Sequence, residues 1–329
     1  MLIRDIAHGE VVTEPGAYRI PIRWYHSQGV CPGPSISSSG LRTIVNQSPW
    51  HFWSTWEGNP DRYEDDEESD ALTLGRAAHA LLLGDAEFNQ EFVYVPADAP
   101  NRPTATQVKA FERDGIWSDK AKPGAEFWQA FDAEAAGRTL LPAAMVETIM
   151  HMRRNLERSP EALAALTGGM TEVSMIWQDD ATGVFIKSRP DTIPDNSCDF
   201  GDLKTFAPRT KSIERAVHQA ITDNGYVMQM ALACMGAEHV LGLVADDCVL
   251  VMAQSTRPFT VTPVRLDAEA LHWGKVLCRH GIDRFAECLK TGHWPMPVEG
   301  VMTYSMPPSL LHRLGELQSS GQLPMQEAA

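Results

Sequence analysis

The sequence predicts a mixed α/β protein, with a central mixed sheet flanked by helices at about residues 170–290. Residues 171–177 and 183–189 alternate around a turn-forming segment, which indicates a β-hairpin. Residues 198–206 and 248–254 are further candidate strands, and segments with helical periodicity lie between and after them. Strands and helices arranged in this order favour a single core in which helices pack on a sheet.

The N-terminal half is expected to be mostly helical after an irregular start. Residues 1–34 are rich in Pro and Gly and lack clean periodicity, which indicates an N-terminal arm. Hydroxyl side chains from Ser35 onward offer N-caps for a short helix that ends near Ser48 and Pro49. The aromatic patch that follows is expected to pack in the core rather than stack on DNA bases, and it comprises Trp50, Phe52, Trp53 and Trp56.

Helices and loops alternate along the rest of the chain. Residues 72–83 are predicted to form a buried helix ended by Gly84, and residues 95–125 a loop-rich excursion. Helical periodicity returns at 125–166, where two prolines interrupt it. The remaining predicted elements are helices at 212–223, 225–241 and 267–290 and a strand at 259–264.

One domain is expected to carry the function. It spans residues 35–297, with the arm at 1–34 before it and a weakly ordered tail at 298–329 after it. No internal repeat or composition-marked linker divides the chain, so the helical N-terminal half is expected to be an elaboration of the same domain.

Composition excludes several classes of protein. The formal charge of −15 argues against a general nucleic-acid coat, because phosphate contacts come from Lys and Arg. Part of that charge lies in the acidic run 61–70, which is expected to be a solvated loop. No apolar run approaches the roughly 18–20 residues of a membrane span, and no secretory signal is visible, so a cytoplasmic protein is expected. The six cysteines lack a CxxC pair, which favours buried free thiols over a zinc or iron–sulfur site.

Charged residues on the predicted strands form a candidate metal-dependent site. Residues two apart on a strand share a face, so the carboxylate of Asp202 and the ammonium of Lys204 meet the same space. Asp191 ends the second hairpin strand, and a short turn between neighbouring strands can bring it beside Asp202. Glu172, near the start of the first strand, could add a third carboxylate. Such a group suits Mg²⁺, which activates water against a phosphodiester, while the lysine orients or deprotonates that water or acts as a fixed charge.

Three further residues gain interest from their positions around this pattern. His79 lies in the apolar helix at 72–83, where a histidine is ordinarily a core residue whose hydrogen-bonding groups have partners. Tyr226 and Gln229 are three apart on a predicted helix and therefore share a face, with packing as the ordinary alternative. A lone Asp-x-Lys is ordinarily a surface ion pair, so these signals count only in combination.

The sequence contains, in chain order, Gly-x-x-x-His, a Glu on a predicted strand, Pro-Asp, Asp-x-Lys and Tyr-x-x-Gln. This series resembles the motifs of the RecE-type exonucleases (exonuclease VIII). These enzymes belong to the PDDEXK superfamily, with lambda exonuclease and the nuclease domain of RecB. The segment Ser37-Ser-Ser-Gly-Leu-Arg, the aromatic patch after it and Thr291-Gly-His-Trp-Pro are also similar to that family. The resemblance covers about residues 35–297 and implies a restriction-endonuclease-like core, but it leaves residues 61–70 and 95–125 unassigned.

The resemblance implies a role for each matched residue at the metal. His79, Asp191 and Asp202 would bind or border Mg²⁺, with Mn²⁺ as a substitute, and Glu172 would contribute a further carboxylate. Lys204 would act on the nucleophilic water. Together these roles imply hydrolysis of DNA phosphodiesters.

The same resemblance implies a substrate and partners. Gln229 and Tyr226 would support the site or touch the DNA backbone. The family degrades linear duplex DNA from 5′ ends and leaves 3′ single strands for an annealing protein in phage-type recombination. Its members form homo-oligomeric rings around DNA, and the candidate channel-lining residues here are Arg76, Arg102, Arg189, Arg209 and Lys211.

Other functions stay open at this point. One is another PDDEXK nuclease, either an endonuclease or an iron–sulfur enzyme of the CRISPR-adaptation type, although unpaired cysteines count against the second. Another is a catalytically silent PDDEXK protein that acts as a DNA-binding or assembly component. The intact set of Asp191, Asp202 and Lys204 speaks against it, because a silent site would have no chemical need for all three. A dinucleotide-binding or P-loop enzyme is disfavoured because neither glycine motif occurs.

Overall fold

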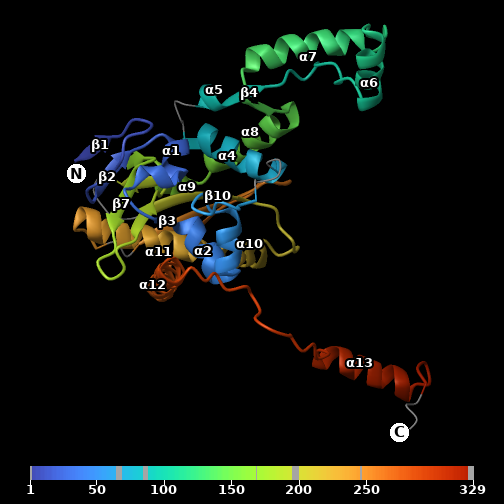
Figure 1. Cartoon of the computed structure of the whole chain (residues 1–329). Helices are drawn as coiled ribbons and strands as arrows, with labels where there is room; N and C mark the ends of the chain where they lie inside the picture. The colour runs from blue at the N-terminus through green and yellow to red at the C-terminus, as the bar shows by residue number, and fades with distance from the viewer. Residues whose placement is uncertain are drawn as a thin grey trace.

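The computed structural model describes residues 2–63, 69–83, 88–167, 169–194, 200–244 and 247–324. The main body holds two five-stranded sheets and the helices that pack on them (Figure 1). A segment with α6 (Ala105–Asp114) and α7 (Lys122–Ala135) projects from one end of this body, and α13 (Pro308–Ser319) stands away from the other (Figure 1). The mixed α/β prediction is confirmed.

The first sheet contains the predicted hairpin. Its strand order is β1 (Ile3–Asp5), β2 (Gly16–Arg19), β7 (Ser174–Gln178), β8 (Phe185–Ser188) and β3 (Ser35–Ser37). β7 and β8 pair antiparallel, as the alternation around the turn predicts. β3 runs parallel to β8, so the start of the next helix lies at the edge where β8 ends.

The first 34 residues belong to this body, so the prediction of an irregular arm at 1–34 is wrong. β2 pairs antiparallel with β7, with Ala17 opposite Met175. Residues of this segment also form a buried cluster with Ile176, and they are Ile6, Val12, Tyr18, Ile20, Tyr25, Val30 and Cys31. Strands of three and four residues are too short to show alternation, and their partner lies far along the chain.

The second sheet is mixed. Its order is β12 (Val261–Leu266), β11 (Cys248–Gln254), β10 (Phe200–Phe206), β9 (Thr192–Pro194) and β6 (Gly169–Thr171). β10 and β11 run parallel, and the other neighbours pair antiparallel. The third predicted strand, β10, was expected to lie beside the hairpin, but it belongs to the other sheet. The short β9, which the sequence did not reveal, pairs with it instead.

Helices cover both faces of this second sheet. α11 (Tyr226–Gly236) contacts β8 and β10 and packs against α2 (Ser38–Asn46) and α12 (Ala268–Thr291). On β11, Leu250 and Met252 belong to this α11 core, whereas Val251 and Ala253 belong to a second core on the opposite face. The second core is built with α4 (Asp70–Leu83), α8 (Ala143–Leu156) and α9 (Pro160–Leu166). The central strand β10, which carries candidate residues, is thus enclosed by helices from both halves of the chain.

The remaining elements are short. They are α1 (Ile22–His26), α3 (Pro49–Thr55), α5 (Phe88–Glu91), α10 (Ile213–Asp223), β4 (Phe92–Tyr94), β5 (Thr139–Leu141), the 3₁₀ turn Gln28–Val30 and the π-helical turn Ala237–Leu241. The helices at 212–223, 225–241 and 267–290 and the strand at 248–254 are confirmed, with shifts of a few residues at their ends.

The aromatic patch packs in the core, as predicted. The rings of Trp53 and Trp294 stack with centroids 4.5 Å apart, and Phe52 meets Phe285 edge to face at 5.4 Å. Trp56 also contacts Phe285 and Trp294. Three of the four patch residues are therefore tied to the end of α12 and are not available to stack on bases.

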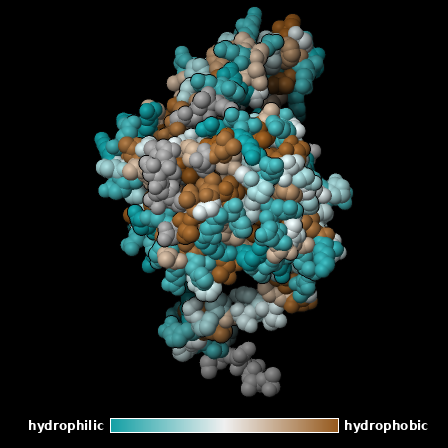
Figure 2. Space-filling view, turned by 90° about the vertical axis from the view of Figure 1, so that its left-hand side faces the viewer, coloured by the Kyte–Doolittle hydropathy of each residue, from teal (hydrophilic) through white to brown (hydrophobic). Residues whose placement is uncertain are grey.

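The excursion at 95–125 is more regular than predicted. Thr104 and Gln107 form a capping box that starts α6, a signal that the sequence contains but that the surrounding Pro and Lys residues obscured. In the space-filling view the molecule extends above and below the body, and the visible face mixes polar and apolar residues (Figure 2). α13 likewise gives the tail a helix that was not expected, and residues 325–329 lie outside the described part.

The described cysteines Cys31, Cys234, Cys248, Cys278 and Cys288 are free and buried, as predicted. Cys198 lies outside the described residues, as do Gly84 and residues 64–68 of the acidic run. Within the described ranges, no helix combines the length and the apolar character that crossing a bilayer requires.

Gly201 permits a close approach between α9 and β10. A Cβ atom at this position would overlap the backbone carbonyl oxygen of Ala165. We expect Gly201→Ala to lower the free energy of unfolding by about 1–3 kcal/mol, because backbone rather than a flexible side chain would have to move. Gly315→Ala, in open space on α13, is the matched control and should not lower it. Denaturant unfolding measures both, and equal stability of Gly201→Ala and the wild type would refute the close approach.

Candidate active site

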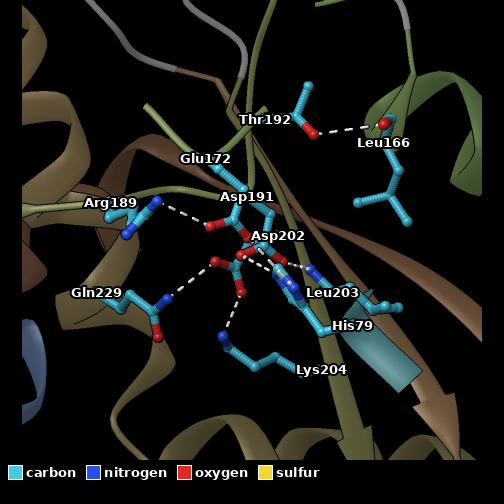
Figure 3. Close-up of polar contacts among 10 residues, drawn as sticks. All are labelled: His79, Leu166, Glu172, Arg189, Asp191, Thr192, Asp202, Leu203, Lys204 and Gln229. Carbon is cyan, nitrogen blue, oxygen red and sulfur yellow. Dashed lines mark hydrogen bonds and ion pairs between the residues drawn. The ribbon is translucent and has the colours of Figure 1, made fainter. Parts of the chain in front are cut away.

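Strand register brings Asp191 and Asp202 face to face. β9 and β10 are antiparallel with Thr192 opposite Gly201, so the next pair along this register is Asp191 and Asp202. The backbone N–H of Leu203 donates to Asp191 Oδ2 at 2.7 Å. Figure 3 shows the two carboxylates side by side. The predicted meeting of the aspartates is therefore achieved, but through β9 rather than through the hairpin.

Asp202 is a fully buried carboxylate with two side-chain partners. Gln229 Nε2 donates to its Oδ1 at 2.9 Å, and Lys204 Nζ lies 2.5 Å from its Oδ2 (Figure 3). Burial, followed by the charge of Asp191, raises the pKa of Asp202 to about 6 against the opposing effects of Lys204 and His79. Lys204 is thus brought to Asp202 as their spacing on one strand predicts.

His79 faces two carboxylates from α4. Its Nε2 lies 2.7 Å from Asp191 Oδ1, and its Nδ1 lies 3.4 Å from Glu172 Oε1. Burial opposes the charged form, but Asp191 and then Glu172 raise the pKa of His79 to about 9. Burial also opposes the charge of Asp191, whose pKa His79 and Lys204 nevertheless hold below its usual value. His79 is therefore a cation between carboxylates rather than a residue packed only against apolar neighbours.

Glu172 occupies an unusual backbone conformation at this site. Its φ is 59°, in the left-handed region that costs a non-glycine residue about 1–3 kcal/mol. Its N–H donates to the carbonyl oxygen of Asp191 at 3.2 Å, and Arg189 Nη2 lies 3.0 Å from its Oε2. Arg189 Nε and Nη1 are buried without a hydrogen-bond partner among the described residues. The fold therefore holds Glu172 beside Asp191 and keeps donor capacity on Arg189.

Tyr226 and Gln229 share one face of α11, as predicted, and both reach the Asp202–Lys204 pair. The Tyr226 ring centroid lies 5.2 Å from Lys204 Nζ and 5.7 Å from Arg42 Cζ. Arg42 Nη1 donates to the carbonyl oxygen of Asn224 at 2.7 Å. Arg42 appeared in the sequence analysis only as the end of the segment 37–42 and was given no role, because nothing in the spacing of α2 indicates that it reaches a segment so distant in the chain.

The five basic residues considered for a DNA channel have different surroundings. Arg189 lies within the site, whereas Arg76, on α4 one turn before His79, pairs with Glu91 and lies over the ring of Phe92. Arg209 lies at a cavity next to the site. Lys211 is exposed just before α10, and Arg102 pairs with Asp132 on the projecting segment, away from the carboxylates. Of these five residues, Arg189 is the one whose contacts place it among the site carboxylates.

The donor atoms of this site suit a hard divalent cation. Across the described ranges, no three His, Cys, Asp or Glu side chains are arranged as a ready ligand group. Cations of the chain itself face the carboxylates, since His79 pairs with Asp191 and Lys204 with Asp202. Two buried aspartates and the neighbouring Glu172 nevertheless offer the carboxylate oxygens that Mg²⁺ prefers, and burying these charges is costly unless a cation offsets them.

The fold and the Pro-Asp and Asp-x-Lys arrangement define a protein of the PDDEXK class. Residues 37–304 match the family described as "PDDEXK-like domain of unknown function (DUF3799)", and the chain belongs to this family. No curated protein sequence matches the chain.

A solved structure shares the fold. A crystal structure from Eubacterium rectale, described as a "Putative exonuclease", is 14% identical, with a TM-score of 0.53 over 84% of this chain and 92% of that chain. The structure of SSO0001 is 15% identical, and its match covers 67% of this chain and 87% of that chain. Its TM-score of 0.25 is too low to indicate a shared fold. At this identity, the first likeness concerns the fold alone.

Proposed function

We propose that this protein is a metal-dependent exodeoxyribonuclease of the RecE type that degrades linear double-stranded DNA. The observation that carries the proposal is the convergence of Asp191, Asp202 and Lys204 at one buried position, where the central strand β10 pairs with β9. A silent DNA-binding protein would have no need to bury two aspartates together. The description of the Eubacterium rectale structure as an exonuclease is consistent with the proposal.

Asp191 and Asp202 would hold Mg²⁺, or Mn²⁺ in its place, with Glu172 and His79 beside them. The bound cation would lower the pKa of a water molecule and neutralise charge that develops on the phosphate. His79 would have to lose its proton to bind the metal directly, because a metal ligand must be deprotonated. As a cation it would instead border the metal and position Asp191.

Lys204 would act as a fixed positive charge near the attacking water. Burial opposes its charged form, but Asp202 and then Asp191 raise the pKa of Lys204 above its ordinary value. A lysine that keeps its proton is better suited to stabilising negative charge than to removing a proton from water. Gln229 would keep the Asp202 carboxylate oriented, and Tyr226 would hold the lysine in place.

The finer parts of this proposal rest on the resemblance to the RecE-type enzymes. They are 5′-to-3′ degradation that leaves 3′ single strands, a homo-oligomeric ring around DNA, an annealing protein as partner and action in the cytoplasm. Residues 35–297 would form the exonuclease domain, with 298–329 as an appended tail. The early strands nevertheless pack into the same body, so we expect residues 1–34 to be needed for folding.

A test of polarity uses linear duplex DNA labelled at either the 5′ or the 3′ end, alongside a closed circle of the same sequence. With Mg²⁺ we expect early release of 5′ label as short products, late release of 3′ label and an intact circle, and with a chelator we expect no cleavage. Cleavage of the circle would identify an endonuclease instead. DNA binding without any cleavage would favour the silent alternative.

A further inference from the structure

A cavity of about 560 Å³ adjoins the candidate active site. Its walls come from the start of α4, the end of β10, α10 and the start of α11. Thr205, which directly follows Lys204, lines it, and so does Tyr226, whose ring centroid lies 5.2 Å from Lys204 Nζ. The cavity therefore borders the carboxylate–lysine centre through two adjoining elements.

The walls combine apolar surface with a few polar groups. Leu74, Phe206 and Ala220 contribute apolar atoms, while Gln219 and Asn224 bring amide groups that can both donate and accept hydrogen bonds. A nucleobase has the same composition, since it is a flat apolar ring system with donors and acceptors at its edge. Small-molecule sites are typically built in this way, with apolar walls and few polar groups.

The charges around the cavity also fit a nucleotide. Arg209 lines it and has a side chain that is 79% exposed, with its Nη1 3.8 Å from Asp223 Oδ2. A pair this open and this long is held weakly, so the guanidinium can turn to a phosphate. The Arg42 guanidinium is also close, with its Cζ 5.7 Å from the ring centroid of Tyr226. Of the phosphates on either side of a bound base, one would thus lie near Arg209 and the other near the cation that Asp191 and Asp202 would hold.

We propose that this cavity binds the base of one unpaired nucleotide of the DNA strand whose phosphodiester lies at the Asp202–Lys204 centre. The inference rests on the proposed nuclease function and names the form of substrate that the site takes. The cavity volume lies within the range of about 300–1,000 Å³ that is usual for small-molecule pockets. It therefore suits a single small ligand and not a duplex. The terminal nucleotide must therefore leave the duplex before cleavage, as bases do in other enzymes that enclose one base.

Direct binding tests the cavity without any need for catalysis. The probe is the 5′-monophosphate of 2-aminopurine deoxyriboside, whose fluorescence changes when its base is enclosed. Ala220→Phe fills the cavity, and Thr222→Phe, on an exposed turn of the same helix and outside the lining, is the matched control. We expect binding by the wild type and the control, and binding roughly tenfold weaker or more for Ala220→Phe. Equal binding by all three proteins, or by none, would overturn the proposal.

Activity measurements separate the cavity from the metal centre. Bis(p-nitrophenyl) phosphate needs only the metal centre, whereas linear DNA would need the cavity as well. Ala220→Phe should lose about tenfold or more in kcat/KM on DNA and keep its activity on the small ester. Equal losses on both substrates would contradict the assignment, because the substitution would then act on the metal centre.

Two further outcomes keep the inference distinct from the proposed function. If the wild type cleaves neither substrate but binds the fluorescent nucleotide in the cavity, the nuclease proposal fails and the binding site stands. If Ala220→Phe does not fold, Gln219→Trp replaces it, because Gln219 is exposed and also lines the cavity. The same pattern of binding and activity is then expected for that variant.

Discussion

Replacing Lys204 with alanine is expected to lower kcat for DNA cleavage by roughly 10²–10⁴-fold, the range typical of a positioned catalytic group. The ammonium lies 2.5 Å from Asp202 Oδ2 on a side chain that is only 17% exposed, so it is fixed beside the position where the phosphate would bind in the proposed function. Single-turnover cleavage of end-labelled duplex at saturating Mg²⁺ measures the chemical step.

The control for this variant is Lys204→Arg, which keeps the positive charge but cannot give up a proton in the ordinary range. Substantial activity in Lys204→Arg would support a fixed charge, and an inactive arginine variant would favour proton transfer or exact placement of the ammonium. Removing the partner of buried Asp202 also destabilises the fold, so thermal unfolding of each variant must accompany the kinetics. Near-normal cleavage by folded Lys204→Ala would remove the lysine from the mechanism.

Asp202→Asn is expected to weaken binding of Mg²⁺ or Mn²⁺ by at least roughly 10- to 100-fold. The amide has nearly the shape of the carboxylate, but it lacks the charge that a hard cation requires. Burial and the neighbouring Asp191 already raise the pKa of Asp202, so loss of its charge relieves repulsion within the apo protein and offsets the loss of the ion pair with Lys204. The variant should therefore fold while failing to hold the metal.

Titration calorimetry with Mn²⁺ measures this change. Asp283→Asn is a suitable control, since Asp283 is an exposed carboxylate paired with Arg279 on α12. The control should bind metal as the wild type does. An unchanged titration of Asp202→Asn would place the metal site elsewhere in the chain.

Most of the long elements could be predicted from the sequence because their periodicity is local. The strand at 248–254 and the helix at 267–290 are long enough for their buried faces to be visible in the residue pattern. β9 and the strands before residue 20 have only three or four residues, and they depend on partners distant in the chain. That dependence explains why two predictions were wrong: an irregular arm at 1–34, and β10 beside the hairpin.

The site was predictable where one element carries two of its residues. Asp202 and Lys204 share a strand face, and Tyr226 and Gln229 share a helix face. The contacts of Arg42, and the way Arg189 holds Glu172, join separate elements, so no spacing within one segment could reveal them.

The central claim is that Asp191 and Asp202 together grip a divalent cation beside Lys204. The most direct measurement is anomalous diffraction from crystals soaked with Mn²⁺, because it locates the metal independently of activity. The account predicts an anomalous peak within ligand distance of both aspartate carboxylates. An anomalous peak next to other residues, with these two carboxylates still paired to His79 and Lys204, would contradict this claim.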